Sequence, residues 1–303
     1  MCAIFGVLDY KGNLEAVQRL RLVKALGTAA EVRGIDATGI AFFQRDKLCI
    51  QKAAKPAHKM KYRIPSEARY IMGHTRMTTQ GSASQNQNNH PFSGKAGGTS
   101  FTLAHNGMLH NDRELQSVRN LPKTDIETDS YVAVQLIEQQ KELTFDSLRV
   151  MAEAVEGSFV FTVLDQDNNL YFVKGDNPLT IYHYPNLGLY LYASTEGILQ
   201  TALSGLWLEK LAPEIIQPED GEILRIDRHG QRSHAKFTMV DSWSAWMLPV
   251  WEQGRAVGRR LPMSEYVDDL KSVAACYGYA PGEIEDMLSN GYTPEEVENM
   301  LYY

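Results

Sequence analysis

Hydrophobic positions along this chain fall into many short strand-like runs and a few segments with helical spacing. The opening AIFGVLDY predicts a buried strand, and apolar residues spaced from Leu14 to Leu26 then predict a helix. Helical spacing returns after Asp129, in YVAVQLIEQQ and FDSLRVMAEAV. Further strands are predicted for TGIAFF, KLCIQKA, RYIMGHTR, TSFTLAHNG, GSFVFTVLD, NLYFVKG, LTIYHYP, LGLYLYAS and GEILRIDRHG.

Polar turn sequences such as DQDNN, YPN and DRHG separate several of these strands, as antiparallel hairpins require. Many strands with two grouped helical regions predict an α+β fold, in which helices cover antiparallel sheets. The chain has 303 residues and is 44% hydrophobic. Because single hydrophobic cores stop growing near about 250–300 residues, this length suits one large domain with a small appendage. We assign the main domain to residues 1–240.

The C-terminal part of the chain differs in pattern from the rest. Residues 241–262 are rich in tryptophan and lack a clear period, which indicates a connector, and residues 263–303 predict an acidic three-helix appendage. Within the appendage GYAPGEIEDML recurs 13 residues later as GYTPEEVENML, where Thr293 and Glu296 form a capping-box pattern. The appendage is either a helical cap on the main domain or a module that binds a partner.

Charge and composition exclude several classes of protein. The net charge is −7, but the nine acidic residues and single lysine after residue 262 account for −8, so the main part is close to neutral. This distribution argues against an extended nucleic-acid surface. No stretch predicts a membrane span or a signal peptide, and three scattered cysteines fit neither a disulfide framework nor a zinc site. We therefore expect a cytoplasmic protein.

Cys2 follows directly on Met1 and is the first candidate for chemistry. If Met1 is removed, one residue carries both a thiol and a free α-amine, whose reference pKa of about 7.7–8.0 lets part of it accept the thiol proton. Nucleophile and base then belong to a single residue. Taken alone, Cys2 is better explained as a buried structural cysteine.

Five further motifs favour a catalytic interpretation of Cys2. They are RGIDATG at residues 33–39, GHTRMTTQG at 73–81, NNHPF at 88–92, AHNG at 104–107 and ETDS at 127–130. With CAIFG at the start, this set resembles the glutaminase domain of class II glutamine amidotransferases. The resemblance implies the four-layer sandwich of N-terminal nucleophile hydrolases, with two antiparallel sheets between helical layers. It also implies hydrolysis of the glutamine side-chain amide.

The resemblance assigns the catalytic groups. Cys2 would be the nucleophile, and the Asn106 side chain and Gly107 backbone N–H would stabilise the tetrahedral oxyanion. Losing one such donor typically costs about 10²–10³ in rate. The alternative for AHNG is an Asn-Gly hairpin turn, a favoured type I′ pair.

The resemblance also assigns the groups that hold a free amino acid. Arg76 would bind the substrate carboxylate, and Asp129 would bind the substrate ammonium. The alternative for this pair is an internal salt bridge, or for Asp129 alone a helix cap before YVAVQLIEQQ. Thr79 would contact substrate, while Arg33 and Asp36 would brace the N-terminal cysteine.

The sequence departs from the family pattern where Met77 and Gln80 stand in place of the usual Trp and His. The polar stretch Ser82 to Asn89 is a candidate lid over bound glutamine, or a disordered segment. His74, His90 and His105 fall in elements that are mainly structural in the family. No metal site and no cofactor are implied, because no ligand cluster has suitable spacing.

Neither a Walker A loop nor an SGGxDS pyrophosphatase loop is present in the chain. We therefore expect a free-standing glutaminase that converts L-glutamine to glutamate and passes ammonia to a separate acceptor-activating protein partner, with no nucleic acid or membrane involved. The sequence is also compatible with a homo-oligomer. Two alternatives remain: a catalytically silent fold kept for binding, and an amide hydrolase acting on another γ-glutamyl or acyl amide.

Overall fold

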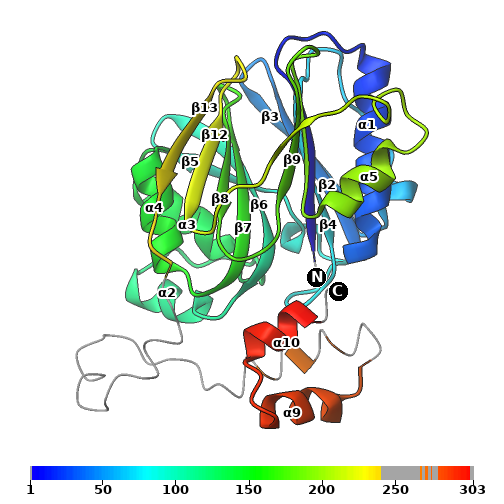
Figure 1. The fold of residues 1–303 in the computed structure, drawn as a ribbon. Helices are drawn as coiled ribbons and strands as arrows, with labels where there is room; N and C mark the ends of the chain where they lie inside the picture. The colour runs from blue at the N-terminus through cyan, green and yellow to red at the C-terminus, as the bar shows by residue number, and fades with distance from the viewer. Residues whose placement is uncertain (1, 240–266, 268–269, 272–273, 275–278, 301–303) are drawn as a thin grey trace.

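The computed structural model describes residues 2–239, 267, 270–271, 274 and 279–300 (Figure 1). The predicted connector at 241–262 lies outside these residues, as does Met1. Two antiparallel sheets form the body, and each contains strands from distant parts of the chain. The α+β class predicted from the sequence is confirmed.

The first sheet has seven strands in the order β11-β9-β10-β1-β4-β2-β3. Strand β1 lies in the middle, between β10 and β4, and every residue of β1 is buried. The runs predicted at this strand and at its neighbours are confirmed. The bounds are β1 Ala3–Asp9, β2 Ala37–Gln44, β3 Lys47–Ala53, β4 Tyr70–Arg76, β9 Thr180–Tyr184, β10 Leu189–Ala193 and β11 Glu214–Ile216.

The second sheet has six strands in the order β13-β12-β8-β7-β6-β5. Its longest strand, β6, pairs with β7 along nine residue pairs, from Phe101 opposite Asp165 to Leu109 opposite Gly157. The bounds are β5 Phe92–Ala96, β6 Thr99–Leu109, β7 Gly157–Asp165, β8 Leu170–Lys174, β12 Glu222–Ile226 and β13 Arg232–Lys236.

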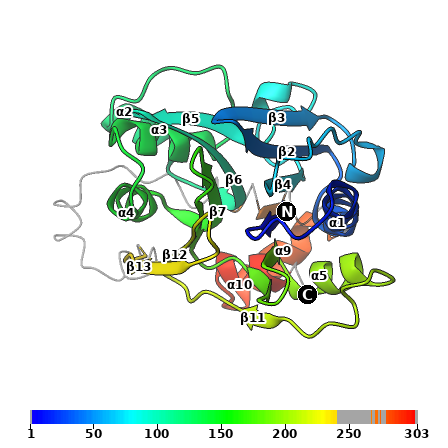
Figure 2. The same cartoon turned by 90° about the horizontal axis from the view of Figure 1, so that it is seen from above.

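Helices cover the outer face of each sheet, and the inner faces pack against each other (Figure 2). Helices α1 and α5 share a core with the first sheet, whereas α3 and α4 share one with the second. A third core of aliphatic and aromatic side chains, including Phe172 and Tyr192, fills the space between the sheets. The helices of the body are α1 Ala16–Ala29, α2 Asp112–Val118, α3 Tyr131–Gln139, α4 Phe145–Ala154 and α5 Glu196–Leu203, with 3-10 turns η1 Ala30–Arg33, η2 Ala57–Lys59 and η3 Asn86–Asn88. These are the four layers that the family resemblance implies.

The hydrophobic pattern missed elements at the margins of the sheets. Strands β5, β11 and β13 were not predicted, and neither were helices α2 and α5. Strands β5, with the sequence FSGKA, and β13, with RSHAK, are edge strands that expose alternate residues, so they lack an apolar run. Strand pairing in the folded protein, rather than local sequence, selects these segments.

The C-terminal appendage contributes helices α9 Pro281–Ser289 and α10 Pro294–Met300. The predicted capping box is confirmed, because Thr293 N donates to Glu296 Oε2 at 2.8 Å and Glu296 N donates to Thr293 Oγ1 at 3.1 Å. Residues 267, 270–271 and 274 are helical, and the rest of the third predicted helix lies outside the described residues.

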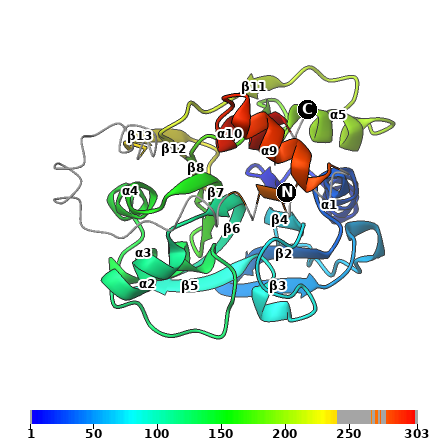
Figure 3. The same ribbon diagram turned by 90° about the horizontal axis from the view of Figure 1, so that it is seen from below.

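A small apolar cluster joins this appendage to the body. Its fully buried members are Leu270, Ala274, Ile284 and Val297, and Met108 of β6 packs among them. Figures 1 and 3 show α9 and α10 at the end of the sandwich where β1 begins. The appendage therefore contacts the body through Met108. Met300 of α10 lies outside this cluster and is 41% exposed.

We expect the substitution Ile284→Asp to detach and unfold the appendage, because it puts an unpaired carboxylate into this cluster. Loss of a buried isoleucine alone costs about 2–5 kcal/mol. Limited proteolysis under native conditions should cleave the variant within the appendage more than about tenfold faster, since cleavage follows the open population. Met300→Asp is the matched control and should be cleaved at the wild-type rate; equal rates for the two variants would contradict the docking.

Candidate active site

The ends of β1, β4 and β6 bring the motif residues together at one end of the sandwich (Figure 3). Cys2 immediately precedes β1, whose first residue Ala3 lies opposite Thr75 of β4. Cys2 Sγ lies 3.5 Å from the backbone oxygen of Met77, and Arg33 Nε donates to the Cys2 backbone oxygen at 3.0 Å. The nucleophile candidate is thus held between two of the predicted motifs.

Burial raises the pKa of the Cys2 thiol, and the positive charge of Arg76 opposes this shift. The thiol is therefore poor at ionising by itself near neutral pH. A nucleophile in this position needs a base that takes its proton during attack.

The AHNG motif lies within the continuous strand β6, so the hairpin-turn alternative is wrong. Asn106 is fully buried, and its Nδ2 has no hydrogen-bond partner among the described residues. Its Oδ1 lies 3.5 Å from Arg33 Nη2, and its backbone oxygen accepts from Asn177 Nδ2 at 3.1 Å. An orphaned buried amide donor is costly, and Asn106 Nδ2 is available to donate to a bound acceptor.

Gly107 follows with φ of +143°, a backbone conformation that favours glycine. A Cβ atom there would lie 1.9 Å from the Ser158 backbone oxygen. The motif thus requires glycine for both conformation and space.

Arg76 ends β4 and is 2% exposed. Its Nη1 donates to Asn89 Oδ1 at 2.7 Å, and its Nη2 donates to the backbone oxygens of Gln80 and Gly81. These acceptors are neutral, and no carboxylate among the described residues lies within ion-pairing distance. Burial lowers the pKa of the Arg76 guanidinium, while Cys2 and Asp129 oppose the shift.

Asp129 precedes α3 and is 8% exposed. Its Oδ2 accepts from Leu109 N at 2.7 Å, and its Oδ1 accepts from Ser130 Oγ at 3.1 Å. The N-cap position of α3 belongs to Ser130, and Asp129 forms no ion pair with the described residues, so neither the helix-cap nor the salt-bridge alternative holds. Burial raises the pKa of the Asp129 carboxyl, and hydrogen bonds from Leu109 and Ser130 oppose that shift.

The polar stretch after Arg76 is folded in this structure. Asn88 Nδ2 donates to Glu127 Oε2 at 2.7 Å, and Glu127 N donates back to Asn88 Oδ1 at 2.9 Å. Asn89 Nδ2 donates to the Ala83 oxygen at 2.8 Å. The stretch therefore forms part of the wall around Arg76, and its movement as a lid stays a prediction.

The supporting residues divide into two groups. Arg33 touches Cys2, whereas the carboxylate of Asp36 accepts from Thr78 N at 2.7 Å. Thr79 is exposed, and its side chain makes no hydrogen bond with the described residues; the neighbouring Thr78 Oγ1 is buried and lacks a partner there.

Sequence reasoning missed three residues that hold the site. Asn89 fixes Arg76, Asn177 fixes the Asn106 backbone, and Gln80 Oε1 accepts from Asp129 N at 2.7 Å. The motifs NNHPF and KGDNPL contain Asn89 and Asn177, but an amide's partner cannot be identified from its position in the sequence. Gln80 was noticed only as a departure from the family.

Three buried histidines lie beneath these groups. The rings of His74 and His90 have centroids 4.2 Å apart, and burial lowers the pKa of His74 and of His105 to about 3, so both are neutral near pH 7. Among the residues that the structure describes, no cluster of three or more His, Cys, Asp or Glu side chains is arranged to hold a metal ion. None of the described helices is long and apolar enough to span a membrane.

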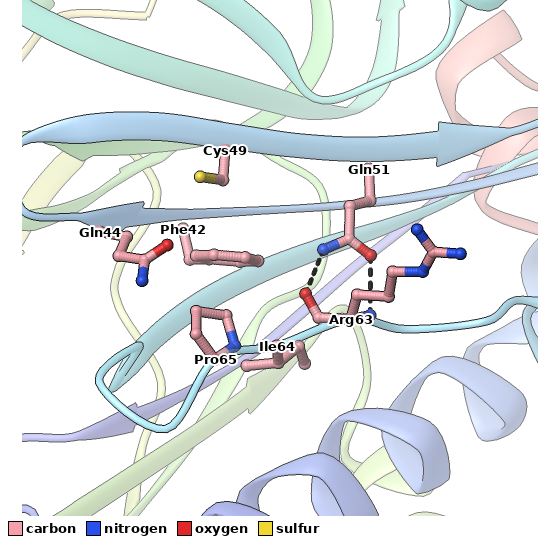
Figure 4. Close-up of a pocket in the computed structure, with 7 residues that line it drawn as sticks. All are labelled: Phe42, Gln44, Cys49, Gln51, Arg63, Ile64 and Pro65. Carbon is pink, nitrogen blue, oxygen red and sulfur yellow. Dashed lines mark hydrogen bonds between the residues drawn. The ribbon is translucent and has the colours of Figure 1, made fainter.

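A surface pocket lies elsewhere, beside β3 (Figure 4). Gln51 accepts from Arg63 N at 2.9 Å and donates to the Arg63 oxygen, which ties the loop to the strand. The pocket contains none of the motif residues. It is lined by Phe42, Gln44, Cys49, Gln51, Arg63, Ile64 and Pro65.

Comparison with known proteins identifies the family. A family model described as glutamine amidotransferases class-II matches residues 1–178. The chain belongs to this family. The class II match covers more than half of the chain and includes all five motifs and Cys2.

Relatives of this class II domain are longer proteins. Glutamine–fructose-6-phosphate aminotransferase of Sulfolobus acidocaldarius is 30% identical over 192 residues, which cover 60% of this chain and 31% of that protein. The Staphylococcus epidermidis protein of the same name is 28% identical over 285 residues, covering 89% of this chain and 46% of that one. The chain thus spans less than half the length of these curated relatives.

The fold of the class II domain also matches a solved structure. Glutamine phosphoribosylpyrophosphate amidotransferase from B. subtilis superposes with a TM-score of 0.61 and 21% identity, covering 78% of this chain and 50% of that one. At this identity the match concerns the fold, which is that of the N-terminal nucleophile hydrolases.

We expect Gly107→Ala to destabilise the class II domain by more than about 1–3 kcal/mol, which is the typical cost of a strained backbone conformation alone. The methyl group would also displace the Ser158 carbonyl. Urea denaturation measures the change in the free energy of unfolding. Gly197→Ala in α5 is the control, because its Cβ would meet no atom within 4 Å, and it should be neutral or stabilising. Similar stabilities for both variants would contradict the strain argument.

Proposed function

We propose that this domain hydrolyses the side-chain amide of L-glutamine to glutamate and ammonia, with Cys2 as the nucleophile. The observation that supports this most is a pair of buried groups, Arg76 and Asp129, that lie near the same cysteine and form no ion pair with the described residues. A free amino acid carries a carboxylate and an ammonium group that complement these two charges. The class II family match supports the same reaction.

Because Arg76 and Asp129 are buried, their attraction to the charges of a bound amino acid is strong. A buried charge that lacks an opposite charge costs several kcal/mol, and a bound zwitterion with matching geometry offsets that cost. Arg76 donates to Asn89, Gln80 and Gly81, which fixes its guanidinium but leaves its positive charge without a counter-ion among the described residues. Asp129 retains carboxylate lone pairs beyond those used by Leu109 N and Ser130 Oγ.

The proposed reaction takes place at the side-chain amide of glutamine, which is the end of the substrate opposite its carboxylate and ammonium groups. The Cys2 sulfur attacks the side-chain amide carbon and forms a C–S bond, while the thiol proton moves to the base. The negative oxygen of the tetrahedral intermediate accepts hydrogen bonds from Asn106 Nδ2 and from the Gly107 backbone N–H. Breaking the C–N bond, with return of the proton, releases ammonia and leaves a thioester. Water then cleaves the thioester to glutamate.

The base in this scheme is the α-amine of Cys2, which becomes free only when Met1 is removed. Met1 lies outside the described residues. The raised pKa of the partly buried Cys2 thiol makes such a base necessary, because little thiolate is present beforehand.

We also propose that the ammonia passes to an acceptor-activating unit beyond the residues of this domain. The curated relatives are named as aminotransferases of fructose 6-phosphate and are more than twice as long as their matched segments. The C-terminal appendage, which packs against Met108, is a candidate contact surface for the partner that accepts the ammonia.

Replacing Cys2 by alanine should reduce glutaminase activity to background, because no C–S bond can form. Cys49→Ala is the matched control, since Cys49 is also a partly exposed free cysteine but lies on β3 in the pocket of Figure 4. Ammonia and glutamate release measure the activity. Intact mass spectrometry with a glutamine-analogue diazoketone should give one adduct, at Cys2, on protein that lacks Met1. Activity that survives Cys2→Ala would refute the mechanism.

Asn106→Ala removes the orphaned amide donor. We expect kcat to fall by about 10²–10³, with KM changed much less, because the oxyanion exists only in the transition state. Steady-state kinetics with L-glutamine measure both constants. A large rise in KM at constant kcat would instead place Asn106 in ground-state binding.

A further inference from the structure

Ser130 occupies the N-cap position of α3, but its hydroxyl does not cap the helix. A serine at this position normally accepts a hydrogen bond from a backbone N–H in the first turn. Here the Ser130 hydroxyl instead lies 3.1 Å from Asp129 Oδ1 and 2.7 Å from His105 Nδ1. Ser130 is 3% exposed, so its hydroxyl serves these two groups rather than solvent.

The His105 ring is fixed on several sides. It stacks on Phe161 with centroids 4.5 Å apart and an interplanar angle of 26°, and it is 1% exposed. Its backbone oxygen lies 3.0 Å from His74 Nε2. The His105 ring therefore reaches Asp129 only through Ser130, and its backbone is followed in β6 by Asn106 and Gly107.

The distances between His105, Ser130 and Asp129 favour one arrangement of protons among these three side chains. The hydroxyl of Ser130 has one proton, and donating it to Asp129 requires that His105 Nδ1–H donate to Ser130 Oγ. The other ring nitrogen, Nε2, lies 3.4 Å from the Ser158 oxygen, which is a longer contact than the 2.7 Å between Nδ1 and Ser130 Oγ. The neutral ring with hydrogen on Nδ1 therefore satisfies the short contacts in one direction, from His105 through Ser130 to Asp129.

We propose that His105 and Ser130 are positioning residues that hold Asp129 ready for the α-ammonium group of the substrate, and so make the site selective for amino acids over simple amides. This inference rests on the proposed function, because it assigns Asp129 to the substrate ammonium. Ser130 Oγ donates to Asp129 Oδ1, whereas Leu109 N donates to Oδ2. With both oxygens oriented, the remaining lone pairs have a fixed direction before the substrate arrives.

The test compares two ligands in Cys2→Ala protein, which binds without turnover. L-Glutamine carries the α-ammonium group, whereas glutaramate has the same carboxylate and amide with hydrogen in its place. Adding Ser130→Ala should weaken L-glutamine binding about tenfold or more, as expected for a lost hydrogen bond to a charged group. Glutaramate binding, measured by NMR titration at millimolar concentration, should change less than twofold.

Ser147→Ala is the matched control. Ser147 is equally buried, at 3% exposure, and belongs to a capping box at the start of α4. It should affect stability without changing the ratio of the two affinities. With Cys2 intact, Ser130→Ala should raise the KM for L-glutamine by the same factor and change kcat much less.

Two results overturn the inference alone: equal weakening of both ligands by Ser130→Ala, which marks a merely structural role, and unchanged L-glutamine binding. If the Cys2→Ala protein binds neither ligand, and the protein with Cys2 intact releases no ammonia from L-glutamine, the proposed function fails and this inference fails with it.

Discussion

The burial of Arg76 without a carboxylate partner in the part of the chain that the structure describes is the constraint on which the rest of the site depends. A guanidinium in this position must find acceptors for its hydrogens, and the chain supplies neutral oxygens from Asn89, Gln80 and Gly81. These contacts fold the polar stretch after β4 back against the sheet. Because the acceptors are neutral, they orient the charge without neutralising it.

Each of the two sheets contributes different residues to the candidate site. The first sheet carries Cys2 and Arg76 on neighbouring strands, and the second carries Asn106 and Gly107 on β6. The packed layer between the sheets fixes the distance from Cys2, the proposed nucleophile, to Asn106 and Gly107, the proposed oxyanion donors. Asp129 belongs to a loop, but its hydrogen bond from Leu109 N ties it to the same strand β6. A precise arrangement on rigid elements is what preorganised catalysis requires.

Much of the fold was predictable because strand and helix periods are local properties. The runs at β1, β3 and β7 and the helical spacing at α1, α3 and α4 were read correctly from the sequence. The edge strands β5 and β13 were not, since their half-exposed faces leave no continuous apolar run. AHNG shows the limit of turn statistics, because a favoured turn pair lies inside a long strand where Gly107 approaches Ser158.

The sequence by itself determined the class of fold, the family and the residue types that the chemistry needs, because these depend on periodicity and on motifs in a fixed order. Only the tertiary structure decided which groups meet. Asn106 Nδ2 is left without a described partner, Ser130 turns from the helix to Asp129, and Met108 packs against the appendage. The physical reason is that burial and hydrogen-bond partnership join residues far apart in the chain, and no local pattern records whether a buried polar atom is satisfied.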